Sequence, residues 1–111
     1  MSPLNLTVHS SANNTVVEVV GELDYATASE LRELITSLTL RPGQHLVLDL
    51  GGMDFCDSSG LTALIIAHNV TEAAGVGLVL AAVPAHTRRV LRTVGLDQIF
   101  VIRSTDDAAT A

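Results

Sequence analysis

One short stretch of the sequence, residues 55–64, combines residue types that could take part in chemistry. Asp57, Ser58 and Ser59 stand in a row, Gly60 follows, and a helix-periodic apolar run begins just after it. Carboxylate and hydroxyl oxygens at such a point cap a helix, because they accept hydrogen bonds from the free N–H groups of its first turn. A hydroxyl there is exposed beside partial positive charge, where a phosphate is favoured. The stretch therefore predicts that Ser58 is a switch residue.

Plain helix capping is the alternative interpretation of these residues. Ser58 acting only as a cap would contribute about 1 kcal/mol to stability. Ser59 is interpreted mainly as a cap, whereas Asp57 could cap the helix, orient a kinase, or do both. A hydrolytic serine would need a nearby histidine with an acidic partner, and Ser58 does not stand in a Gly-x-Ser-x-Gly pattern. We therefore predict a binding protein without catalytic residues.

The remaining reactive side chains do not suggest a second site. Cys56 is interpreted as a small buried residue and Asp49 as a structural hydrogen-bonding group. Three arginines of one predicted helix are expected to form a solvated face: Arg88, Arg89 and Arg92. The histidines lack the spacing of metal ligands, so we predict no metal and no other cofactor: His9, His45, His68 and His86.

Composition narrows the class of protein. A chain of 111 residues predicts one domain spanning residues 1–111, with a core over about 4–104 and a loosely ordered tail over 105–111. Hydrophobic residues make up 48% of it, which excludes disorder except at the ends. The net charge is −6 and lysine is absent, so binding to nucleic-acid phosphates through bulk electrostatics is not expected.

The sequence also predicts where the protein acts. A single cysteine cannot form an internal disulfide, which fits a reducing compartment. No charged-then-apolar leader opens the chain, and its longest apolar-rich run, residues 61–67, is too short to span a bilayer. We therefore expect a soluble, cytoplasmic protein without membrane contact.

Apolar periodicity predicts an α/β fold: a mixed sheet with an N-terminal antiparallel hairpin, later parallel strands and about three to four packed helices. The hairpin is followed by strands and helices in alternation, which right-handed crossovers connect. The expected strands cover about residues 4–8, 15–20, 45–50, 76–83 and 99–103, and the expected helices cover about 27–39, 58 or 59 to 73, and 84–94.

Four local features of these elements are also predicted. Residues 21–24 are expected to leave the second strand, and residues 51–54 are expected to form a loop. Thr27 and Glu30 have the spacing of a capping box. The apolar run 46–48 suggests a strand that is buried on both faces. Asp24 is expected near the Ser58 loop, although a helix-leading acidic residue is an equal alternative.

Several motifs in one order resemble those of STAS domains, and more narrowly those of the stand-alone bacterial anti-sigma factor antagonists. The resemblance covers about residues 4–104. Its motifs are Gly21-Glu22-Leu23-Asp24 with Thr27-Ala28 and Leu31, Leu46-Val47-Leu48-Asp49-Leu50, Asp57-Ser58-Ser59-Gly60-Leu61, and Arg88-Arg89-Val90-Leu91 with Gly95-Leu96.

The resemblance implies a partner-switching cycle in transcription regulation. The unphosphorylated antagonist would bind an anti-sigma factor that is also a serine/threonine kinase, and a sigma factor would be freed. The kinase would then phosphorylate Ser58, and a metal-dependent serine phosphatase would reverse this. The expected partner-binding residues are Asp24, Asp57, Ser58, Ser59, Gly60, Thr62 and Ile66. The alternative is a non-switching STAS scaffold of a signalling assembly, or an accessory subunit of a lipid transporter.

Two positions depart from the family's pattern. Thr62 stands where many members have glycine, and with Ile66 one turn later it adds bulk to the face that a partner helix would approach. Cys56 stands where a larger apolar residue is common.

Overall fold

A computed structural model describes residues 3–103 of the chain. The predicted tail at 105–111 lies outside the described residues. The elements, in chain order, are β1 (Asn5–Ser10), β2 (Asn14–Leu23), α1 (Ala28–Ser37), β3 (His45–Cys56), α2 (Ser58–Ala73), β4 (Gly77–Ala81), α3 (Ala85–Thr93), the 3-10 helix η1 (Leu96–Gln98) and β5 (Val101–Arg103).

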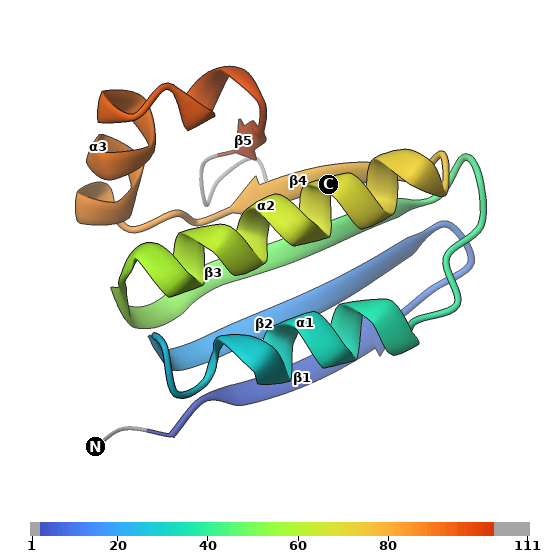
Figure 1. Cartoon of the computed structure of the whole chain (residues 1–111). Helices are drawn as coiled ribbons and strands as arrows, with labels where there is room; N and C mark the ends of the chain where they lie inside the picture. Colours follow the sequence, from blue (N-terminus) through green and yellow to red (C-terminus); the bar gives the residue numbers. More distant parts are fainter. Residues whose placement is uncertain (1–2, 104–111) are drawn as a thin grey trace.

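The five strands form one mixed sheet in the order β1-β2-β3-β4-β5. β1 runs antiparallel to β2, whereas the pairs β2–β3, β3–β4 and β4–β5 are parallel. α1 and α2 lie side by side over one face of the sheet, and α3 lies toward its β4–β5 side (Figure 1). The predicted α/β fold with an antiparallel hairpin and later parallel strands is therefore confirmed.

The core lies between the sheet and the two helices. Successive residues of a strand point to opposite faces, so alternate apolar residues of β2 and β3 reach the helices. Leu31 and Ile35 of α1 and Leu64 of α2 belong to the same core cluster as these strand residues. Each fully buried side chain of this kind contributes roughly 1.5–3 kcal/mol. The core side chains of the two strands are Val17, Val19, Leu23, Leu46, Leu48 and Leu50.

Both central strands extend further than the sequence pattern indicated. β2 continues to Leu23, and β3 continues to Cys56 through the four residues 51–54 that were predicted to form a loop. The pairing of β2 with β3 shifts register between Glu18 and Glu22. At this irregularity a side chain on Gly52 would come within 2.9 Å of Val20. The glycines therefore permit close strand pairing in a bulged region and do not mark a turn.

The predicted burial of β3 on both faces is also wrong. Leu46 and Leu48 point to the helices and are fully buried, whereas Val47 between them is half-buried on the opposite face. α1 and α2 both cover the same face of the sheet, which explains this difference (Figure 1). A continuous run of apolar residues therefore does not prove that both faces of a strand are fully buried.

The predicted capping box at α1 does not form. Thr27 is the N-cap residue, but its side chain makes no capping bond. The Thr27 hydroxyl instead donates to the Glu22 carbonyl at 2.7 Å, and one carboxylate oxygen of Asp24 accepts the N–H groups of Ala26 and Thr27. Asp24 thus stabilises the turn before α1. Hydrogen bonds within residues 22–27 take the place of the predicted capping box.

The core assignment predicts a large difference between two alanine substitutions. Leu48→Ala removes a fully buried side chain, and we expect its free energy of unfolding to fall by about 2–5 kcal/mol. Val20→Ala in the neighbouring strand removes a side chain that is 42% exposed, and its cost should stay below about 1 kcal/mol. Urea denaturation followed by circular dichroism measures both values, and equal costs would contradict the assignment.

Candidate functional site

The candidate site is built around the carboxylate of Asp57, which precedes α2. One of its oxygens accepts the Gly60 N–H at 3.0 Å, so Asp57 is the N-cap of the helix. The other oxygen accepts the Tyr25 N–H at 3.2 Å. The Asp57 N–H in turn donates to the carbonyl of Leu23 at the end of β2. A single side chain therefore joins the start of α2 to the loop between β2 and α1.

Ser58 is the first residue of α2, and its side chain is exposed. Its carbonyl accepts a hydrogen bond from the Thr62 hydroxyl at 2.9 Å. Within residues 3–103 the Ser58 hydroxyl makes no hydrogen bond, and it lies at the positive end of the helix dipole. The site thus presents a free hydroxyl group on a backbone that is already fixed.

Ser59 does not act as the predicted cap, because Asp57 occupies that role. Its side chain is half-buried and lines a hollow of about 390 Å³ between the first turns of α1 and α2. The hollow is hereafter the α1–α2 hollow, and its lining residues are Tyr25, Ala28, Ser29, Arg32, Ser59 and Thr62.

Gly60 allows α2 to approach the ends of the two central strands. A side chain at this position would come within 2.5 Å of the Leu23 carbonyl oxygen and 2.8 Å of the Cys56 sulfur. The Cys56 sulfur lies next to Gly60. Burial raises the pKa of this thiol from 9.0 to about 11, and the nearby charge of Asp57 is a second, smaller cause. The thiol is therefore neutral at physiological pH, as expected for a packing residue.

The other predicted partner-binding residues lie around this point. The structure places Asp24 in the loop that Asp57 holds, and it places Thr62, with an exposed side chain, on the first turn of α2. Ile66 lies one turn further along the helix and is half-buried. All seven predicted partner-binding residues therefore belong to the β2–α1 loop, to the cap of α2 or to the first nine residues of that helix.

Sequence reasoning missed Tyr25 and Arg32. The Tyr25 side chain is 86% exposed, and both residues line the α1–α2 hollow. An aromatic side chain in a polar loop was the only available signal for Tyr25, and the arginine resembles any solvated helix residue. Tyrosine and arginine are both enriched among the residues that contribute most to protein–protein interfaces.

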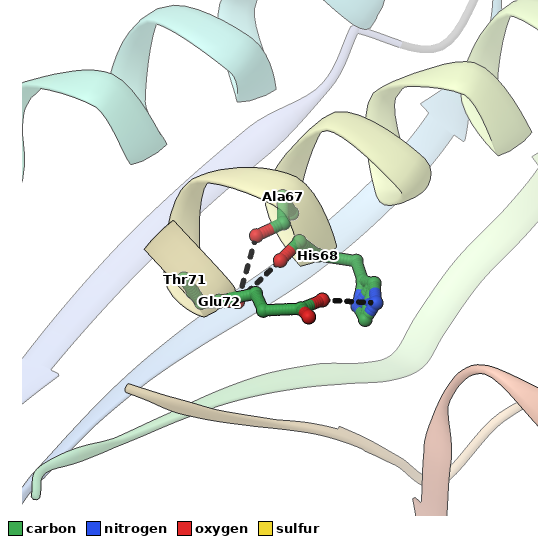
Figure 2. Close-up of polar contacts among 4 residues, drawn as sticks. All are labelled: Ala67, His68, Thr71 and Glu72. Atoms are coloured by element: carbon green, nitrogen blue, oxygen red, sulfur yellow. Dashed lines mark hydrogen bonds and ion pairs between the residues drawn. The ribbon is translucent and has the colours of Figure 1, made fainter. Parts of the chain in front are cut away.

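The opposite half of α2 holds a separate set of polar contacts (Figure 2). The Thr71 hydroxyl donates to the carbonyls of Ala67 and His68, and a ring nitrogen of His68 lies 3.0 Å from a carboxylate oxygen of Glu72. The His68 ring also meets Phe100 edge-on at 5.9 Å. These contacts lie within the helix or between the helix and the end of the sheet, so we assign them a structural role.

The described part of the chain offers neither a cluster of metal-binding side chains nor a membrane-spanning helix. Among residues 3–103, no group of three or more histidine, cysteine, aspartate or glutamate side chains could hold a metal ion. Over the same residues, each helix is too short or too polar to cross a membrane.

Comparisons with known proteins agree with this architecture. The STAS domain family model matches residues 4–109. The anti-sigma-F factor antagonist RsfB of Mycobacterium tuberculosis is 33% identical over 98% of this chain and 91% of its own length. The crystal structure of an anti-sigma factor antagonist from Mycobacterium paratuberculosis is 31% identical, with a TM-score of 0.77, and covers 96% of this chain and 92% of that one.

A third solved structure, from Thermotoga maritima, extends the likeness at the level of the fold. It superimposes with a TM-score of 0.82 at 20% identity, covering 95% of this chain and 91% of its own.

The position of Asp57 predicts a specific loss of stability. Asp57→Ala removes both the helix cap and the bond to Tyr25, so we expect the free energy of unfolding to fall by about 1–2 kcal/mol. Asp54→Ala, at an exposed position of β3, is the matched control and should change it by less than about 0.5 kcal/mol. Amide hydrogen exchange should accelerate at Gly60 and Tyr25 in Asp57→Ala alone. Unchanged exchange at both amides would rule out the proposed bridge.

The raised pKa of Cys56 predicts slow alkylation of the folded protein. A shift from 9.0 to about 11 lowers the thiolate population at pH 8 about a hundredfold. We expect iodoacetamide to react at least tenfold more slowly with the native protein than with the protein in urea. The native rate should rise about tenfold per pH unit between pH 8 and 10. Equal rates in the folded and unfolded states would contradict the burial of this thiol.

Proposed function

The chain belongs to the STAS domain family, and we propose that it acts there as an anti-sigma factor antagonist controlled by phosphorylation of Ser58. The observation that carries the proposal is the exposed Ser58 hydroxyl at the start of α2, on a backbone fixed by Asp57 and Thr62. The names of the relatives that match along nearly the whole chain support the general role.

The proposed partner is an anti-sigma factor that is also a serine/threonine kinase. The unphosphorylated chain would bind it in the cytoplasm and free a sigma factor, and a metal-dependent serine phosphatase would restore this form. The chain itself would be a binding protein and not an enzyme. Its docking surface would combine the α1–α2 hollow with the exposed first turn of α2, so that Tyr25 and Thr62 lie beside Ser58.

The local electrostatics explain how a phosphate would act as a switch. A phosphoserine adds about −1.5 to −2 charges and three acceptor oxygens. At the start of α2 the helix dipole and free N–H groups favour this charge, so the fold is preserved. In a docked complex the same phosphate would have to be desolvated beside the carboxylate of Asp57. A penalty of a few kcal/mol lowers affinity by tens- to hundreds-fold, which suffices without a change of fold.

Substitutions at Ser58 test the switch directly. Ser58→Ala keeps the surface uncharged and should bind the kinase constitutively. Ser58→Asp adds a negative charge at the same point and should bind at least tenfold more weakly. Asn69→Asp adds the same charge at an exposed position on the far half of α2 and should leave affinity unchanged. The kinase can be isolated with the Ser58→Ala variant and its affinity for all three variants measured by calorimetry.

Mass spectrometry of the protein from its own cells separates the possible outcomes. A single phosphate on Ser58 whose occupancy changes between growth and stress is the expected result. A phosphate on Ser59 would keep the mechanism and correct the residue. Equal affinities of Ser58→Ala and Ser58→Asp, with no phosphate in any condition, would overturn the switch. That result would favour a non-switching scaffold or a transporter subunit.

A further inference from the structure

The α1–α2 hollow has the chemistry of an anion site. Arg32 is the only charged residue among those that line it, and the lining includes no carboxylate. Four of the other lining residues carry hydroxyl groups, which can donate hydrogen bonds to an anion: Tyr25, Ser29, Ser59 and Thr62. The remaining arginines of the chain lie in the loop after α1, in α3 and in β5: Arg41, Arg88, Arg89, Arg92 and Arg103. The positive charge beside the candidate site therefore comes from Arg32.

Within residues 3–103 the charge of Arg32 is not engaged by an acidic side chain. The two ion pairs of this part of the chain both use histidine as the cation. Side chains on a helix meet those three or four positions away, and at these distances from Arg32 the chain has only uncharged residues. Glu30 and Glu33 stand two positions before and one position after it, where they do not face it. The Arg32 guanidinium is therefore available to an anion that reaches the hollow.

Ser58 lies at the rim of this hollow. Thr62 stands one turn after Ser58 on the same side of α2, and its hydroxyl donates to the Ser58 carbonyl at 2.9 Å. Thr62 and Ser59 both line the hollow, whereas the Ser58 side chain is exposed beside them. A group added to the Ser58 hydroxyl would therefore stand next to the opening, on the side of α2 that faces α1.

We propose that Arg32 binds the phosphate of Ser58 within the same chain. This inference rests on the proposed phosphorylation of Ser58 and names the side chain that receives the new charge. A guanidinium forms two parallel hydrogen bonds with phosphate oxygens, and such charge-assisted bonds are stronger than neutral ones. The ion pair also offsets the repulsion between the phosphate and the carboxylate of Asp57, which caps the same helix.

The internal ion pair gives the phosphate a second way to oppose docking. Arg32 comes from α1 and Ser58 from α2, so a bond between their side chains spans the mouth of the α1–α2 hollow. The hollow is part of the proposed docking surface, and its cation would then be bound to the phosphate. A partner would have to break this pair in addition to desolvating the phosphate. Phosphorylation thus changes the shape of the surface as well as its charge.

Titration of the phosphate provides the test, and it does not require the kinase. Phosphoserine is incorporated at position 58 of the full chain during synthesis, and phosphorus NMR follows its second ionisation. An adjacent cation favours the dianion, so the ionisation constant should be about two- to fivefold larger than in Arg32→Gln. Arg41→Gln removes an exposed arginine outside the hollow and should leave the constant unchanged. The helix dipole and Asp57 act on the phosphate in all three proteins, so the differences report the arginines.

A second measurement observes the arginine itself. The side-chain N–H groups of Arg32 should exchange with water at least about threefold more slowly in the phosphorylated chain, whereas those of Arg41 should not change. Salt at about 1 M should reduce both effects, because the pair is exposed. Equal ionisation constants in the wild type and Arg32→Gln would overturn the ion pair and leave the proposed switch at Ser58 intact. Absence of phosphate on Ser58 in cells would instead overturn the switch, and with it any role of this pair.

Discussion

The arrangement at the start of α2 depends on one carboxylate that satisfies two backbone groups in different elements. Asp57 holds the Gly60 N–H of the helix with one oxygen and the Tyr25 N–H of the preceding loop with the other. The second bond spans 32 positions of the sequence, so it converts a local cap into a tertiary constraint. The exposed residues on both sides, including Ser58 and those of the α1–α2 hollow, are fixed relative to one another because this side chain holds both segments.

The sheet provides the rigid base for this constraint. β3 is the longest strand, it pairs with a neighbour on each side, and it ends at Cys56, directly before Asp57. Gly60 then lets the first turn of α2 rest against the end of β2, where any larger residue would collide with the Leu23 carbonyl. The site is thus supported by the core and not by a mobile loop. This location allows a charge to be added there without disturbing the packing below.

The sequence predicted an element correctly where a local signal, such as helix periodicity or a capping residue, was enough to determine it. The one-sided stripe containing Leu31 and Ile35 identified α1, and the cluster at residues 57–60 located the start of α2, because helix periodicity and capping chemistry are local. The errors occurred where tertiary contacts decided the outcome. The glycines at 51 and 52 serve a bulge in β3, whose presence depends on the partner strand. Thr27 does not form the predicted capping box because its hydroxyl donates a hydrogen bond to the Glu22 carbonyl instead.

At the candidate site, too, local signals were read correctly and features set by tertiary contacts were not. Three candidate caps stood in a row, and only the folded geometry identified Asp57 as the one that accepts the Gly60 N–H. Tyr25 could not be found in advance, because its role depends on the distance between two loops. Four valines show the same dependence on tertiary structure, because they lie far apart in the chain and are aligned only through strand register: Val16, Val47, Val79 and Val101.

The helical backbone at Ser58 also has a consequence for any enzyme that modifies it. Many modifying enzymes thread their target as an extended strand through a cleft, but this serine lies in a turn closed by the Thr62 hydroxyl and the Asp57 cap. Threading would require that turn to unwind. An enzyme that modified Ser58 without unwinding this turn would therefore have to recognise the folded surface around it. A linear peptide with the sequence of residues 55–64 would lack that conformation and would be a poor substrate for such an enzyme.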